Sequence, residues 1–152
     1  METIDKAKAA RVWQRVQGDV ATNPTRGLQG LIAEEWTDAA LYLSLSRRVQ
    51  GNAAVILRKM GQEEQAHMAC LKGIYTLLGT GRPNVPTPPA PDHAPVSTML
   101  RRCYGREMRC LAQYEARAND PEYGQIFTRM AQQEREHCRQ ILELLGSLPA
   151  DK

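Results

Sequence analysis

Apolar residues recur at every third or fourth position in four long segments of the chain, residues 27–49, 53–79, 96–119 and 121–146. This period places the apolar residues on one face of an α-helix and leaves the charged residues on the opposite face. The sequences QGN at 50–52 and NDP at 119–121 interrupt the pattern within each pair of segments, and both favour turns. The pattern therefore predicts an all-α fold, a four-helix bundle made of two helical hairpins.

A proline-rich segment separates the two hairpins. Residues 80–95 hold six of the nine prolines of the chain, so we expect no helix there. A polyproline-like chain rises about 3.1 Å per residue and would span roughly 45 to 50 Å here, which exceeds the length of a helix of about 25 residues. We therefore expect a long crossover from one end of the bundle to the other, with His93 exposed on it.

The two ends of the chain lie outside the predicted bundle. Residues 1–26 form an N-terminal amphipathic segment, in which residues 4–17 predict a short helix with Ile4, Trp13 and Val16 on its apolar face. This helix would serve as a cap or as an oligomer contact. Gly146 stops the last predicted helix, and residues 147–152 are a tail.

The composition fits one globular domain, because the chain has 152 residues of which 42% are hydrophobic and 24% charged. Its 20 basic and 17 acidic residues are interspersed and give a net charge of +3, which indicates neither nucleic-acid nor membrane binding. The N-terminal residues lack the apolar core of a signal peptide, and no stretch approaches the roughly 18 apolar residues of a membrane span. We expect a cytoplasmic protein.

The four cysteines contain no C-x-x-C pair; they are Cys70, Cys103, Cys110 and Cys138. This spacing argues against a zinc ribbon, a thioredoxin-type motif or a rubredoxin module, and we expect reduced thiols. Cys103 and Cys110 lie seven residues apart on one helix face. Cysteine usually packs there as a small apolar residue, and a redox or ligand role is the alternative.

Acidic and histidine residues interrupt the apolar faces at regular places. Glu64 and His67 lie three residues apart in the second segment, and Glu134 and His137 repeat this spacing in the fourth. Residues i and i+3 share a helix face, so each pair presents a carboxylate and an imidazole to the same point. An unpaired carboxylate in a core is costly or takes up a proton. These groups therefore need a shared partner.

The antiparallel register supplies two further carboxylates. Glu35 lies about as far before the first turn as Glu64 lies after it, and Glu107 and Glu134 have the same relation to the second turn. Four carboxylates balance two divalent cations in charge, and oxygen and imidazole ligands suit iron, manganese or a mixed pair of the two. The predicted metal ligands are Glu35, Glu64, His67, Glu107, Glu134 and His137. The alternative is a metal-free bundle in which buried glutamates and histidines pair with one another.

Four other acidic residues lie close to these positions along the chain. Glu34 points about 100° away from Glu35, and Glu115 is too near its turn to share the level of the predicted ligands. Glu63 and Glu136 occupy helix positions that favour solvent. We expect none of the four to bind metal.

We call Glu35 and Glu107 the unpaired glutamates, because neither has a histidine three residues later. A tyrosine follows each of them by seven residues, or two helical turns: Tyr42 follows Glu35, and Tyr114 follows Glu107. Helical side chains lean toward the N-terminus, and a buried phenol needs a hydrogen-bond partner. We predict that Tyr42 bonds to Glu107 and that Tyr114 bonds to Glu35. These bonds would fix the orientation of the carboxylates and tune the oxidised state of the metal centre. Core packing with some other polar partner is the alternative.

This pattern resembles the ferritin-like superfamily, in which four helices carry one Glu, a Glu-x-x-His pair, another Glu and a second Glu-x-x-His pair. The resemblance covers residues 27–146, and the helix sequences LIAEEWTDAALYLSLSRR and MAQQEREHC look closest to rubrerythrin-like members. It implies a ferritin-like four-helix bundle with two iron ions, in which Glu64 and Glu134 are the bridging ligands. Rubrerythrins carry a rubredoxin module and a further Glu at the position of Cys110, so electrons here must come from an external donor.

The same resemblance implies a non-haem dimetal oxidoreductase that reduces peroxide or dioxygen, and we expect it to be a homodimer. One alternative is a ferroxidase or iron-storage protein of the bacterioferritin type. Another is a non-catalytic bundle that uses metal for stability or for partner binding. Both hairpins are about one turn shorter than those of ferritins, and no fifth helix pattern follows Gly146, which argues against assembly into a storage shell.

Overall fold

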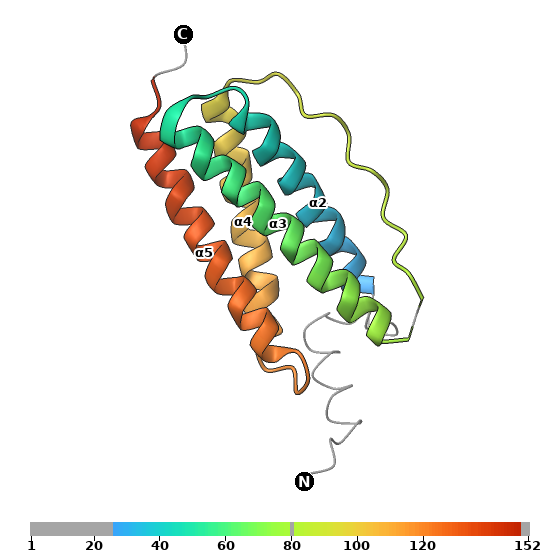
Figure 1. Ribbon diagram of the computed structural model, residues 1–152. Helices are drawn as coiled ribbons and strands as arrows, with labels where there is room; N and C mark the ends of the chain where they lie inside the picture. The colour runs from blue at the N-terminus through green and yellow to red at the C-terminus, as the bar shows by residue number, and fades with distance from the viewer. Residues whose placement is uncertain (1–25, 80, 150–152) are drawn as a thin grey trace.

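The computed structural model describes residues 26–79 and 81–149, and every regular element in this part of the chain is an α-helix. The four helices, labelled as in Figure 1, are α2 (Arg26–Ser46), α3 (Gly51–Leu77), α4 (Val96–Ala116) and α5 (Gly124–Ser147). They form the all-α bundle that the apolar pattern predicts. The N-terminal helix predicted at residues 4–17 lies outside the described residues.

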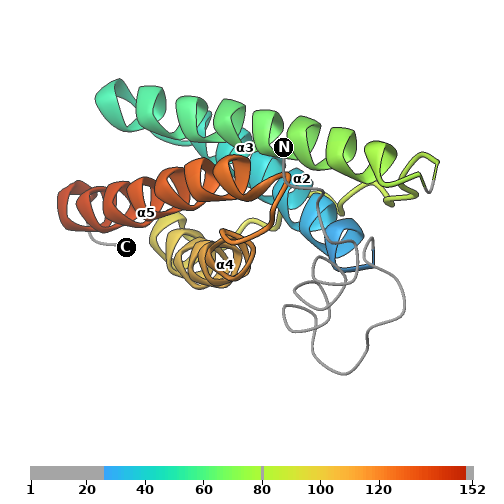
Figure 2. The same ribbon diagram turned by 90° about the horizontal axis from the view of Figure 1, so that it is seen from below.

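Two antiparallel hairpins make up the bundle. α2 packs mainly against α3 and α4 packs mainly against α5, while smaller contacts join α2 to α4 and α3 to α5. In Figure 1 α3 and α4 run in one direction, and α2 and α5 run in the opposite one. Figure 2 shows the two hairpins as neighbouring layers. The interior of the molecule therefore lies between the hairpins.

The segment that joins the hairpins contains no helix over residues 81–95. It runs along the outside of the bundle from the end of α3 to the opposite end, where α4 begins (Figure 1). Near α4 the Arg102 side chain holds this segment through a 2.8 Å bond to the carboxylate of Asp92. His93 is exposed, as the sequence predicts.

Several helices are shorter than the sequence predicts, and the difference is largest around the second turn. α4 ends at Ala116 rather than at residue 119, and α5 begins at Gly124 rather than at residue 121. α2 likewise ends at Ser46 rather than at residue 49, because the next two residues form a turn. Apolar periodicity continues through these turns, so it does not mark where the helical hydrogen bonding stops.

Asp120 and Gly124 shape the turn between α4 and α5. The Asp120 carboxylate accepts the backbone N–H groups of Glu122 and Tyr123 at 2.9 and 2.7 Å, so it caps a turn that precedes the helix. The N-cap residue of α5 itself is Tyr123, which makes no side-chain capping bond. A Cβ atom on Gly124 would lie 2.4 Å from the carbonyl oxygen of Ala118, so the close approach of the chain requires glycine.

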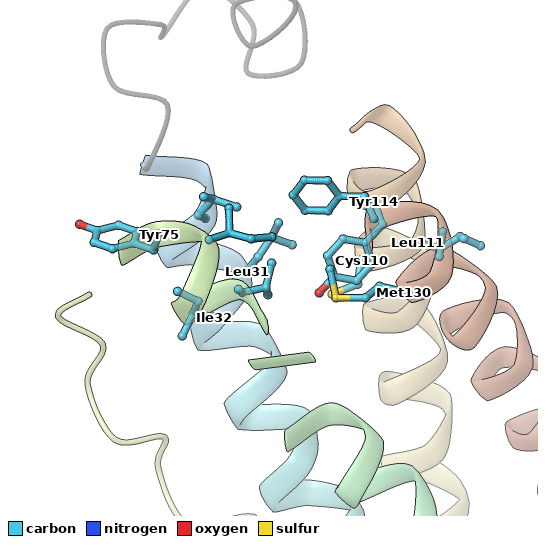
Figure 3. Close-up of a cluster of buried hydrophobic side chains, with 12 residues drawn as sticks. Leu31, Ile32, Tyr75, Cys110, Leu111, Tyr114 and Met130 are labelled. Carbon is cyan, nitrogen blue, oxygen red and sulfur yellow. The ribbon is translucent and has the colours of Figure 1, made fainter. Parts of the chain in front are cut away.

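The core consists of two apolar clusters with a polar layer between them. The first joins side chains of α2 and α3 to those of α4 and α5 (Figure 3): Leu28, Leu31, Ile32, Leu71, Ile74, Tyr75, Cys110, Leu111, Tyr114, Phe127, Met130 and Ala131. The second contains Tyr42, Leu45, Leu57, Met60, Met99, Leu100, Cys103, Ile141 and Leu144. Burial of one large apolar side chain stabilises a fold by about 1.5 to 3 kcal/mol, so these clusters can offset the cost of buried polar groups.

None of the described helices is long and apolar enough to cross a lipid bilayer.

Candidate metal centre

Each of the four helices contributes acidic or histidine side chains to the polar layer. The layer consists of Glu35 from α2, Glu64 and His67 from α3, Glu107 from α4, and Glu134 and His137 from α5. All six side chains are buried, with at most 2% of any residue exposed. The six residues that the sequence singles out as ligands thus meet in the interior, although they are up to 102 positions apart along the chain.

The six side chains form two overlapping groups, in each of which the possible ligand atoms lie within 4.8 Å of one another. One group contains Glu35, Glu64, His67 and Glu134, and the other contains Glu64, Glu107, Glu134 and His137. Glu64 and Glu134 belong to both groups. The two glutamates that the resemblance assigns as bridges therefore lie where a carboxylate can reach both halves of the cluster.

The two imidazole rings have the same orientation within the cluster. Nδ1 of His67 faces inward, 2.8 Å from Glu134 Oε1 and 3.1 Å from Glu64 Oε2. Nδ1 of His137 faces inward as well, 2.9 Å from Glu64 Oε1 and 3.5 Å from Glu107 Oε2. Each ring therefore presents one nitrogen to the carboxylates and turns the other one outward.

The outward nitrogen of each ring has a specific partner. Nε2 of His137 lies 2.7 Å from Oε2 of Glu63, and Nε2 of His67 lies 2.6 Å from Oε1 of Gln133. Both partners accept hydrogen bonds at these atoms, so Nε2 carries the proton in each ring. A neutral imidazole then has its lone pair on Nδ1, directed at the cluster. This is the arrangement that orients histidine for metal binding.

Glu63 is only partly exposed, with 24% of its side chain accessible, and it accepts a bond from the buried His137 that the sequence does not predict. Helix periodicity places Glu63 at the edge of its own helix, but the partner lies on the other hairpin. Gln133 was missed for the same reason. The sequence does contain one signal, since each of these residues directly precedes a motif glutamate.

The other three acidic residues that the sequence places near the ligands are Glu34, Glu115 and Glu136. They lie outside the six-residue cluster, and each pairs with an arginine side chain.

Both predicted tyrosine bonds are present and cross between the hairpins. The hydroxyl of Tyr42 on α2 donates to Oε1 of Glu107 on α4, and the hydroxyl of Tyr114 on α4 donates to Oε1 of Glu35 on α2. Both rings are fully buried. Each unpaired glutamate is thus held by one oxygen, and its other oxygen, Oε2, faces the cluster.

A further buried carboxylate, Asp38, lies beside the layer on α2. Arg106 on α4 donates from Nε to Asp38 at 2.5 Å, and its other end lies 2.8 Å from Glu34. Burial raises the pKa of Asp38, while the Arg106 guanidinium favours its charged form. Arg106 therefore links the two hairpins at the edge of the centre, a contact that the sequence analysis did not anticipate.

Without metal, the four buried carboxylates of the cluster lie too close together for all of them to be ionised. Burial and the neighbouring Glu35 raise the pKa of Glu64 well above its usual range, and burial and Glu64 do the same for the pKa of Glu134. Burial opposes charge on His137, yet its contacts with Glu107 and Glu63 raise its pKa to about 10. The cluster thus holds extra protons when no cation neutralises it.

Several inward atoms of the cluster make no hydrogen bond, although some lie close to one another: Glu35 Oε2, Glu64 Oε1, Glu107 Oε2, Glu134 Oε1 and His137 Nδ1. Buried polar atoms without partners are rare in folded proteins because each costs about 1 to 3 kcal/mol. Here the unpartnered atoms are four carboxylate oxygens and one imidazole nitrogen, all directed at one another. A metal ion satisfies such a set, and the residues therefore fit a metal centre.

No protein-family model, curated protein or solved structure matches the chain. The polar layer itself is thus the basis on which the function of the protein is inferred.

Proposed function

We propose that the protein is a dimetal carboxylate oxidoreductase of the rubrerythrin-like, ferritin-like type. The direction of the helices supports this assignment, because two hairpins joined by a long external segment are the topology of ferritin-like bundles. The Glu and Glu-x-x-His pattern adds to it, since a bundle of this type takes one carboxylate from each of two helices and a pair from each of the others.

One observation carries the proposal: six buried residues from four helices converge in two overlapping groups, and the inward atoms of five of them lack hydrogen-bond partners. Glu35 and His67 would hold one ion, Glu107 and His137 would hold the other, and Glu64 and Glu134 would bridge the two. The four negative charges of the carboxylates balance the four positive charges of two divalent cations. Oxygen and imidazole ligands without thiolate favour iron or manganese over structural zinc.

Iron in such a donor set supplies reversible one-electron chemistry, with which peroxide or dioxygen can be reduced. The protein side chains position the ligands and keep the centre dry. Tyr42 and Tyr114 fix the orientation of Glu107 and Glu35, respectively. Glu63 and Gln133 fix the rings of His137 and His67, and the apolar clusters on both sides exclude bulk water. The four cysteines form no C-x-x-C pair that could hold a rubredoxin-type iron centre, so an external donor would return the electrons.

A single-turnover experiment tests the proposal. Metal-free protein is loaded anaerobically with two equivalents of ferrous iron, mixed with hydrogen peroxide or with dioxygen, and followed by its near-ultraviolet absorbance. We expect rapid oxidation by at least one of the two oxidants, and reversal by a chemical reductant. Protein loaded with zinc is the redox-inactive control.

The same sample distinguishes the alternatives. A native mass of a large shell, with uptake of many iron atoms per chain, would favour iron storage instead. Bound iron that neither oxidant oxidises faster than iron in buffer would contradict an oxidoreductase and leave a metal-stabilised bundle.

A further inference from the structure

The two histidines of the centre occupy equivalent places but have unlike partners. Glu63 directly precedes Glu64, and Gln133 directly precedes Glu134, so the two hairpins offer residues at matching positions. Glu63 accepts from Nε2 of His137 at 2.7 Å, whereas Gln133 accepts from Nε2 of His67 at 2.6 Å. One imidazole is therefore backed by a carboxylate and the other by a neutral amide.

A carboxylate and an amide act differently on the ring. A hydrogen bond to an ionised acceptor is roughly twice as strong as one between neutral groups. It draws the Nε2 proton toward the acceptor, which increases the electron density on Nδ1 and makes the imidazole a better metal ligand. The outer residue thus tunes the ligand without contacting the ion.

The structure supports an ionised Glu63. Its second oxygen, Oε1, lies 3.7 Å from the ammonium group of Lys59, and 24% of the side chain is exposed to solvent. The oxygen that faces His137 is Oε2, so the two contacts do not compete. Gln133 is neutral and has no comparable effect on His67.

We propose that the two metal positions are inequivalent: the position at His137 binds its ion first and more tightly, and the position at His67 binds second and exchanges more readily. This inference rests on the dimetal function proposed above. It assigns Glu63 and Gln133 as positioning residues that set the order of loading. In an oxidoreductase, such an order makes the ion at His67 the more labile of the two.

Other features of the centre are nearly symmetric between the hairpins. Each unpaired glutamate accepts from one tyrosine, and the bridging positions belong to both groups. The clearest other asymmetry is the contact of Arg106 with Asp38 on α2, since the matching position on α4 is Cys110. The experiment must therefore separate the effect of Glu63 from that of the Arg106 contact.

An exchange of the two outer residues provides this separation. Metal-free wild-type protein and the variants Glu63→Gln, Gln133→Glu and the double exchange are titrated with cobalt(II), using calorimetry and visible absorption. In the wild type we expect two steps whose affinities differ by about tenfold to 100-fold, the range in which such outer contacts act. Glu63→Gln should weaken the tight step, and Gln133→Glu should strengthen the weak one.

The double exchange should restore two steps in the reverse order. Proton NMR with one equivalent of cobalt(II) assigns this order, because the ring signals of His137 should shift first in the wild type and those of His67 first in the double exchange. The exposed His93 serves as an internal reference. Both substitutions preserve side-chain size, and circular dichroism checks that each variant is folded.

Three results would overturn the inference: equal affinities in the wild type, no change on Glu63→Gln, or the wild-type order in the double exchange. The last would assign the asymmetry to Asp38 and Arg106. Each of these results leaves two bound ions and the proposed function intact. Failure of folded wild-type protein to bind cobalt(II) would instead contradict the dimetal function itself.

Discussion

Tyr42 and Tyr114 are the residues whose partners follow most directly from the sequence. A spacing of two turns after each unpaired glutamate, together with the crossing of the hairpins, predicts the bonds to Glu107 and Glu35. Each bond leaves one oxygen of the glutamate free for metal. We therefore expect the hydroxyls to control how the carboxylates are oriented rather than whether metal binds.

For Tyr42→Phe and Tyr114→Phe we predict unchanged metal content and oxidation by peroxide that is slower by about tenfold. The metal-free variants should also lose roughly 1 to 3 kcal/mol of unfolding free energy, because a buried carboxylate loses its donor. Elemental analysis, stopped-flow absorbance and urea denaturation measure the three quantities. Tyr104→Phe is a matched control on α4, since Tyr104 packs outside the polar layer. Wild-type oxidation rates in both variants would show that these tyrosines serve only in packing.

The predicted ligands meet in the structure, whereas the partners of the histidines were not predicted. Glu35 and Glu64 share a level because antiparallel helices have a fixed rise per residue, and this can be counted along the sequence. The contact between Glu63 and His137 depends on how far the two hairpins approach and on which rotamer each side chain adopts. Periodicity within one helix contains no information about either.

At the scale of helices, the sequence predicts the core faces better than the helix ends. Apolar spacing locates the faces because every buried turn must satisfy it. The ends depend instead on local bonds, such as the two that Asp120 accepts, and on close backbone approaches. Gly124 is an example, because its missing Cβ permits the approach of the Ala118 carbonyl group, which lies on the preceding turn.

We predict that Gly124→Ala destabilises the protein by about 1 to 3 kcal/mol, since the added methyl group must displace backbone. Gly73→Ala is the matched control within α3, where a Cβ atom meets nothing within 4 Å. That substitution should stabilise the protein by about 0.5 to 1 kcal/mol, because alanine is the better helix former. Urea denaturation with metal bound measures both. Equal effects of the two substitutions would show that the second turn tolerates a larger residue.

At the scale of the whole molecule, the buried centre couples folding to metal and to protons. His137 in the metal-free protein has its pKa raised from 6.5 to about 10, and the pKa values of Glu64 and Glu134 are also raised. A group whose pKa is higher in the folded than in the unfolded chain stabilises the fold below its unfolded pKa. That contribution is lost as the pH rises through the folded pKa.

We therefore predict that the melting temperature of the chelated protein falls as the pH rises from 6.5 to 9. Each proton that the folded chain holds in excess of the unfolded one lowers the unfolding free energy by about 1.4 kcal/mol per pH unit. Bound metal replaces these protons, so the melting temperature of the loaded protein should change less and the difference between the two forms should widen. Scanning calorimetry at several pH values measures both curves. Parallel curves would contradict a coupling through the polar layer.

The central claim is that one cluster of six buried residues holds two metal ions, and the metal content of purified protein tests it most directly. Wild-type protein and the His67→Ala, His137→Ala double variant are loaded with ferrous iron or manganese without oxygen, desalted and measured by elemental mass spectrometry, with circular dichroism as the check on folding. We predict two ions per chain in the wild type and a clear loss in the folded variant. Absence of bound metal in the wild type, or two ions per chain in the double variant, would contradict the claim.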